Sequence, residues 1–123
     1  EGVAELFRHG CILTEFGEVA GYEAVLDMYR NSTRLYPDGT PCTRHLTTNL
    51  AIAVDGSHAR CASTFTVMQA LDDFPLQAII CGRYEDTLVR DTDGWRFDQR
   101  RMLPEMLGDL SRHLLFDLAR PGA

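Results

Sequence analysis

The stretch that decides the fold is Cys42-Thr-Arg-His-Leu-Thr-Thr-Asn-Leu-Ala-Ile-Ala-Val54, followed by Asp55-Gly56 and a β-prone run from His58 to Gln69. Polar and apolar residues alternate over most of the first run, which is the period of a strand with two different faces. An Asp-Gly pair between two such runs is a strong signal for a tight hairpin turn. The sequence therefore predicts a long antiparallel hairpin over residues 42–69.

This hairpin also predicts which side chains share a face. With Asp55-Gly56 as a two-residue turn, His45 should lie opposite Thr66 and Leu46 opposite Phe65. One face would then gather Leu46, Leu50, Cys61 and Phe65, and the other would gather His45, Thr47, Asn49, Thr64, Thr66 and Met68. A polar row with a lone histidine is more typical of a pocket wall than of a solvent face. The row therefore indicates a substrate-binding surface around His45.

The rest of the chain predicts helices before the hairpin and strands after it. Apolar and aromatic residues at helical spacing predict an amphipathic helix over 21–36, on the stripe Tyr22, Val25, Leu26, Tyr29, Thr33 and Tyr36. Strands are expected over 76–90, with a bulge near Gly82, and over 95–102. A leucine stripe after Pro104 predicts a helical tail within 103–123. Hairpin strands and separate helices indicate an α+β fold, and the length indicates a single domain over 1–123.

Composition and charge limit the kinds of partner that the sequence predicts. The formal net charge is −6 and no cluster of Lys or Arg is present, which argues against a nucleic-acid partner. No apolar run is long enough to cross a membrane. The four cysteines are far apart without a C-x-x-C pair, which favours free thiols in the cytoplasm. The histidines show no metal-binding spacing, so no metal is expected.

Several short motifs, in their order and spacing, carry a family resemblance. They are residues 5–13 (Glu-Leu-Phe-Arg-His-Gly-Cys-Ile-Leu), Gly21-Tyr-Glu-Ala-Val, Arg44-His45-x3-Asn49, Val54-Asp-Gly-Ser-x-Ala59, Gly82-Arg-Tyr-Glu-Asp86 and Gly94-Trp-Arg-Phe97. Together they resemble the SnoaL-like branch of the nuclear transport factor 2-like superfamily, over about residues 1–102. That branch includes polyketide cyclases, scytalone dehydratase, bile-acid dehydratase and hexachlorocyclohexane dehydrochlorinase.

The resemblance implies a cone-shaped α+β barrel, in which a curved antiparallel sheet wraps around helices, and a homodimer packed through the sheet. It implies that His45 is the general acid or base and that Arg100 or Arg101 matches an arginine on the last strand. In those relatives the histidine pairs with an Asp on a first helix that this chain lacks. A second pocket histidine of scytalone dehydratase would fall near Met68 or Gln69, where this chain has none.

These observations lead to one hypothesis with two alternatives. The first is a cofactor-free lyase, isomerase or cyclase, dehydratase-like, in which His45 moves a proton on a small apolar or polyketide-like substrate. Arg100 or Arg101 would steady the developing negative charge, and Tyr29, Thr47, Asn49, Thr64, Thr66 and Met68 would line the site. The alternatives are a non-catalytic ligand-binding or accessory module and a purely structural dimer. A structural His45 would instead be hydrogen-bonded to Thr64 or Thr66.

Overall fold

The structure is a computed structural model that describes residues 1–118. Two helices and six strands follow one another along this part of the chain. They are α1 (Gly2–Leu6), β1 (Cys11–Thr14), β2 (Gly17–Ala20), α2 (Tyr22–Ser32), β3 (Thr43–Asp55), β4 (His58–Leu71), β5 (Phe74–Asp91) and β6 (Gly94–Leu107). None of the helices in these residues is long and apolar enough to span a membrane.

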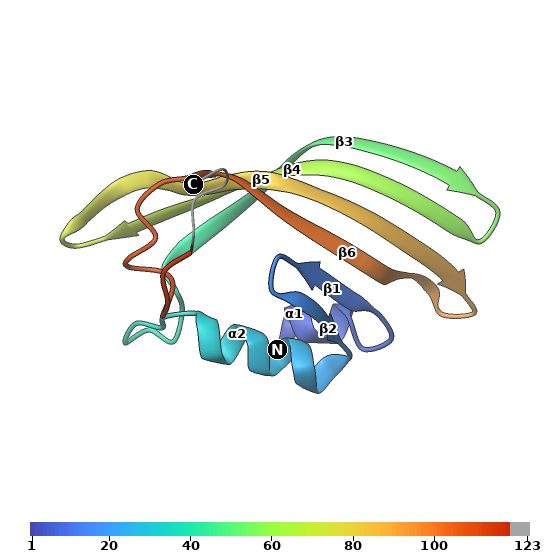
Figure 1. The fold of residues 1–123 in the computed structure, drawn as a ribbon, viewed down its shortest axis with the longest axis horizontal. Coiled ribbons are helices and arrows are strands. Elements are labelled where there is room, and N and C mark those ends of the chain that lie inside the picture. The colour runs from blue at the N-terminus through green and yellow to red at the C-terminus, as the bar shows by residue number, and fades with distance from the viewer. Residues whose placement is uncertain (119–123) are drawn as a thin grey trace.

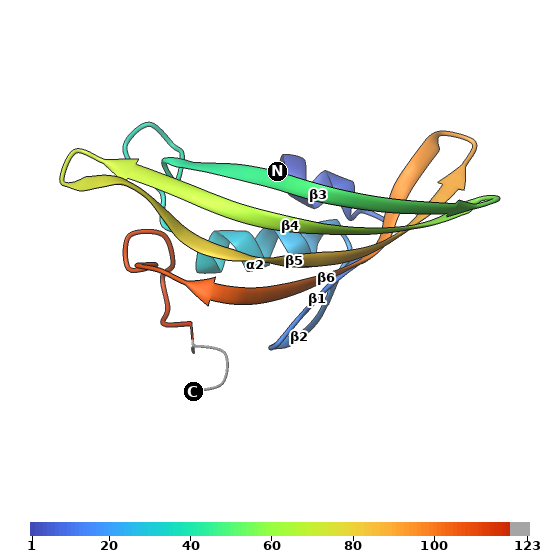
Figure 2. The ribbon, with the colours of Figure 1, turned by 90° about the horizontal axis from the view of Figure 1, so that it is seen from above.

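The six strands form one curved sheet in the order β2-β1-β6-β5-β4-β3. Neighbouring strands are antiparallel except for β1 and β6, which are parallel. In Figure 1 the long strands β3 to β6 arch over β1, β2 and both helices. Seen from above, β3 forms one edge of the sheet, and α2 lies beneath the long strands (Figure 2). This confirms the predicted α+β class with a curved antiparallel sheet around helices, although the sheet is not closed.

The predicted β3–β4 hairpin forms, but its register differs from the expected one. Asp55 pairs with His58, so the two-residue turn is Gly56-Ser57, where Gly56 supplies the positive φ of 60°. A bulge then shifts the register between Thr48 and Ala51. Asn49 occupies this bulge with a φ of 54°, a left-handed conformation that Asn tolerates better than most residues.

The turn at Gly56-Ser57 shifts the predicted pairing by two residues and the bulge shifts it back by one, so beyond the bulge the pairing differs from the predicted one by one residue. His45 lies opposite Val67, not Thr66, and Leu46 lies opposite Thr66, not Phe65. Because side chains alternate along a strand, this slip exchanges the faces of the partner strand. On the inner face His45 therefore has the buried Val67 as its neighbour, while Thr66 lies on the outer face with Leu46.

Helix α2 is shorter than its stripe predicted. Val25 and Leu26 are buried, as expected, but the helix ends at Ser32 and Thr33 is extended. Thr33 forms a β-bridge with Leu114, and the backbone N–H of Leu115 donates to the Ser32 carbonyl. The segment after β6 thus forms hydrogen bonds with the backbone at the end of α2. Thr33 and Tyr36 therefore do not continue the helix.

The helical tail predicted after Pro104 is wrong for the described residues. β6 continues through Pro104 to Leu107, and residues 108–118 form turns and irregular backbone. The bulge predicted near Gly82 lies at Ile79, which is the extra residue of β5 in its pairing with β4. Pro104 lies opposite Gly82, next to a second bulge in which Glu105 is the extra residue of β6. A proline is tolerated in a strand at such a bulge. The predicted tail beyond Leu118 lies outside the described residues.

Two hydrophobic clusters frame the interior. The first joins α1, β1 and α2 through Ala4, Phe7, Ile12, Val25 and Leu26, and the second joins β4 and β5 through Phe65, Val67, Phe74, Ile79 and Tyr84. Met102 packs against both clusters. The space between the helices and the inner face of the sheet is where a ligand could lie.

Candidate functional site

A cavity of about 320 Å³ lies between α2, the β1–β2 hairpin, the inner face of the sheet and the segment after β6. Most of its wall is apolar, with Met28, Phe65, Val67, Ile80 and Met102 among the lining residues. Concave and largely apolar sites with a few polar groups are typical of small-molecule pockets. The polar groups are therefore the candidates for chemistry.

His45 lines this cavity, as the sequence predicted. β3 is the edge strand, so much of the residue stays exposed, and partial burial lowers the pKa of its imidazole. The imidazole has no hydrogen-bond partner among the described residues. Thr64 bonds instead to Thr48 at 2.7 Å and to Asn49 at 3.3 Å. The structural alternative, a His45 bonded to Thr64 or Thr66, is not seen.

The remaining predicted binding residues divide into two groups. Tyr29 lines the cavity, whereas Thr47, Asn49, Thr64, Thr66 and Met68 do not. Thr64, Thr66 and Met68 belong to the outer face, because the buried residues of β4 alternate with them. Asn49 makes the cross-strand bond to Thr64 within the bulge. The one-residue slip of register therefore removes most of the expected polar wall.

Arg100 and Arg101 lie on opposite faces of β6, and neither lines the cavity. Arg100 points inward and makes two hydrogen bonds of 2.8 and 3.0 Å to the carboxylate of Asp86. Its guanidinium also lies 3.7 Å from the centre of the Tyr84 ring. Arg101 is exposed, 3.9 Å from Glu85. Of the two, only Arg100 is close to a residue of the cavity wall.

Two tyrosines bring phenol groups to the cavity. Tyr29 comes from α2 and Tyr84 from β5, and neither hydroxyl has a hydrogen-bond partner within residues 1–118. Burial raises the pKa of Tyr29 to about 12, with a smaller contribution from Tyr84. Burial also raises the pKa of Tyr84, while the Arg100 cation opposes that rise. Both phenols are hydrogen-bond donors near neutral pH. Tyr84 was not among the predicted site residues; its alternation with Arg83 and Glu85 along the strand is the signal that could have placed it on one face with Asp86.

A second histidine, His113, also lines the cavity and was missed from the sequence. The expected helix hid it, because its position depends on the irregular segment after β6. Burial lowers the pKa of His113, and the charge of His45 lowers it further. Within residues 1–118 no group of three or more His, Cys, Asp or Glu side chains is placed to hold a metal ion.

The profile of the SnoaL-like domain matches residues 1–101. The chain belongs to the SnoaL-like family. No curated protein shows a significant match. The fold is that of nuclear transport factor 2-like proteins, since solved structures with this cystatin-like fold superpose on the SnoaL-like chain.

Three solved structures illustrate the similarity. A protein of unknown function from Mycobacterium tuberculosis is 28% identical, with a TM-score of 0.69, over 87% of this chain and 60% of its own length. A candidate scytalone dehydratase from Novosphingobium aromaticivorans is 20% identical, with a TM-score of 0.66, over 99% of this chain and 79% of that chain. LinA is 21% identical, with a TM-score of 0.63, over 93% of this chain and 75% of that chain. The SnoaL-like chain thus spans less than two thirds of the first of these relatives.

Proposed function

We propose that this SnoaL-like protein is a cofactor-free lyase, isomerase or cyclase for a small, largely apolar carbonyl compound, in which His45 transfers a proton. The observation that carries the proposal is the unpaired imidazole of His45 on an apolar cavity that also presents the hydroxyls of Tyr29 and Tyr84. Histidine titrates nearest to neutral pH and suits proton transfer to or from carbon or a leaving group.

Tyr29 and Tyr84 would stabilise the developing negative charge, which is the role that the sequence assigned to Arg100 or Arg101. When a C–H bond next to a carbonyl breaks, its electron pair moves onto the carbonyl oxygen. That oxygen would accept hydrogen bonds from Tyr29 and Tyr84, which are preorganised donors in a largely apolar cavity. Arg100 would act through Tyr84, because a cation against the ring favours partial negative charge on the phenol oxygen.

The reaction classes differ in how the electron pair is used afterwards. In a lyase it expels a leaving group that takes a proton, in an isomerase a proton returns to another carbon, and in a cyclase the carbon attacks an internal carbonyl. Each class needs a proton carrier in the cavity, and His45 is placed to be one. None needs an oxidant or reductant.

A ligand-binding or accessory module is the second candidate. It is favoured by the absence, among the described lining residues, of a carboxylate bonded to His45. It is also favoured by structural similarity to the beta subunit of a candidate aromatic-ring-hydroxylating dioxygenase from Novosphingobium aromaticivorans, which is 15% identical with a TM-score of 0.62. A module of this kind would bind a small, largely apolar compound without converting it.

The test is turnover of 4-hydroxy-4-phenylbutan-2-one to its enone, followed by absorbance, with binding followed by calorimetry. His45→Gln should lower the rate by ~10²–10⁴, the usual scale for losing a general acid or base, and leave binding intact. Thr47→Ala is the matched control, because Thr47 is on the same strand face but does not line the cavity. Turnover that survives His45→Gln contradicts the proposal, and binding without turnover in the wild type supports the module.

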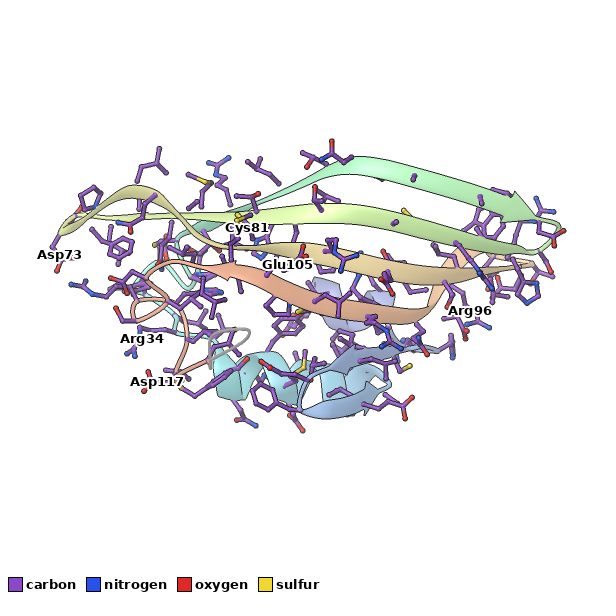
Figure 3. All side chains as sticks on the ribbon, turned by 45° about the horizontal axis from the view of Figure 1, so that its top comes forward. Arg34, Asp73, Cys81, Arg96, Glu105 and Asp117 are labelled. Carbon is purple, nitrogen blue, oxygen red and sulfur yellow. The ribbon has the colours of Figure 1, made fainter. Side chains whose placement is uncertain are left out.

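We also propose a homodimer that packs through the outer face of the sheet. Leu46, Thr66, Cys81 and Met106 form one cross-strand row on that face. Leu46 is 50% exposed and Met106 66% exposed, and Figure 3 shows Cys81 and Glu105 on the same convex side. Exposed apolar rows of this kind mark interfaces. Sedimentation at micromolar concentration should show a dimer that Met106→Lys dissociates, and a wild-type monomer would contradict the proposal.

Two further expectations remain proposals. A cytoplasmic location is supported by the four cysteines, which are all free thiols in the structure. The absence of a nucleic-acid partner rests on the net charge of −6.

A further inference from the structure

His113 and His45 line the same cavity although they come from opposite ends of the sheet region of the chain. His45 is two residues along β3 from Thr43, on the same face, and Thr43 lies opposite Gln69 on β4. The side chain of Gln69 is 1% exposed and donates from Nε2 to the carbonyl of Arg112 at 3.0 Å. Gln69 therefore holds the residue before His113 against the start of the hairpin that carries His45.

The backbone of His113 is fixed from the other side as well. Its carbonyl accepts a 2.8 Å hydrogen bond from the N–H of Arg34, and its own N–H donates to Leu110 at 3.1 Å. The hydroxyl of Tyr36 also donates to the Arg112 carbonyl. Figure 3 shows Arg34 and Asp117 at the same end of the molecule, below the sheet. His113 is thus held in place by residues from α2's end, β4 and its own turn.

The imidazole of His113, in contrast, makes no hydrogen bond to any described residue. Its Nδ1 is buried and unpaired. A buried ring nitrogen without a partner is unfavourable, and buried polar groups are normally satisfied. Because Nδ1 is buried, Nε2 is the ring nitrogen left for contact with a ligand in the cavity. A fixed backbone with an unpaired ring is an arrangement expected of a group that works on a ligand.

Other titratable groups define the charge around this ring. Tyr29 and Tyr84 line the cavity as neutral phenols, and Glu15 and Glu18 line it from the β1–β2 hairpin. His45 is the group whose charge lowers the pKa of His113, so a proton on His45 disfavours a second proton on His113. Burial lowers the pKa of His45 as well, and two histidines that interact in this way take up their protons in two separate steps.

We propose that His113 is the second acid–base residue of the cavity: neutral His113 removes the proton next to the substrate carbonyl, and protonated His45 delivers a proton elsewhere on the substrate. In an elimination the C–H electron pair becomes the new C=C bond, the C–O electron pair leaves with oxygen, and that oxygen takes the proton from His45. The pair begins and ends with one proton. The assignment rests on the proposed function and adds a division of labour to it.

Two reactions of one probe separate the roles. For 4-hydroxy-4-phenylbutan-2-one, exchange of the α-protons in D₂O needs only the base, whereas elimination needs the base and the acid. His113→Gln should lower both rates by ~10²–10⁴. His45→Gln should lower elimination by the same factor and leave α-exchange within about threefold. His58→Gln is the matched control, because His58 is exposed beside the β3–β4 turn and does not line the cavity.

A measurement without turnover tests the pair itself. NMR titration of the ring C–H resonances should show that His45→Gln raises the pKa of His113. Thermal unfolding verifies that each variant is folded. An unchanged pKa of His113, or wild-type exchange in His113→Gln, overturns the inference while leaving the role of His45 intact. Elimination that survives His45→Gln instead overturns the proposed function.

Discussion

The guanidinium of Arg100 stacks on the ring of Tyr84 at 3.7 Å while its N–H groups bind the carboxylate of Asp86. Asp86 and Tyr84 are 5% and 8% exposed, so the cation is held between a buried carboxylate and the cavity wall. Arg100 therefore contacts both the buried carboxylate of Asp86, which it neutralises, and Tyr84, which lines the cavity.

Arg100→Met should be strongly destabilising because it leaves Asp86 buried without its counter-charge. Breaking a buried ion pair from one side typically costs about 3–5 kcal/mol of unfolding free energy. Arg101→Met is the control, since Arg101 and Glu85 are both exposed and such pairs contribute about 0–1 kcal/mol. Urea unfolding measures both variants, and equal losses would contradict the burial argument.

Tyr84→Phe and Tyr29→Phe should lower kcat/KM by ~10²–10³, the range found for removing one donor to a developing oxyanion. Stability should change little, because neither hydroxyl has a hydrogen bond to lose within the described chain. Tyr36→Phe provides the contrast: its hydroxyl bonds the Arg112 carbonyl, so its loss should cost about 1 kcal/mol. Enone formation and urea unfolding are the measurements. Full activity in both cavity variants would remove the phenols from the mechanism.

Stability should fall between pH 7.5 and pH 5. Burial lowers the pKa of His45 and His113 in the folded protein, so the unfolded chain binds more protons as the pH drops through the ordinary histidine range near about 6.5. The free energy of unfolding is then highest above that range and decreases below it. His45→Gln/His113→Gln should flatten the dependence in urea unfolding at stepped pH. The lowered pKa values of Asp38, Asp73 and Asp109 act at more acidic pH, outside this window.

Gln69→Leu should destabilise the segment after β6. Nε2 of Gln69 bonds the carbonyls of Pro41 and Arg112, and the substitution leaves both without this donor at a cost of about 1–3 kcal/mol. Amide hydrogen exchange at Arg34, whose N–H bonds His113, should speed up with it. Gln77→Leu is the control, because Gln77 bonds only Pro75 on the exposed surface. Unchanged exchange at Arg34 would mean that Gln69 does not anchor this segment.

The sequence by itself determined the elements whose signals are local. Alternation over 42–54 predicted β3, the Asp-Gly pair predicted the hairpin, and helical spacing predicted the buried face of α2. The family motifs were likewise readable, since they depend on residues and spacing. His45 was correctly expected on the cavity wall, because strand alternation from the start of β3 still holds on its side of the bulge.

Only the tertiary structure decided what His45 faces. The turn at Gly56-Ser57 alone would place Met68 opposite His45, and the extra residue at the Asn49 bulge places Val67 there instead of the predicted Thr66. A period of two reveals neither of these shifts. His113 was hidden for a related reason: its place depends on bonds from Gln69, Arg34 and Leu110, of which the first two are distant in sequence. A leucine stripe predicts a helix from local spacing, but pairing of β6 with β5 through Leu107 satisfies the same backbone with distant partners. Local sequence patterns therefore determined the strands and helix α2, whereas non-local hydrogen bonds determined which side chains surround the cavity.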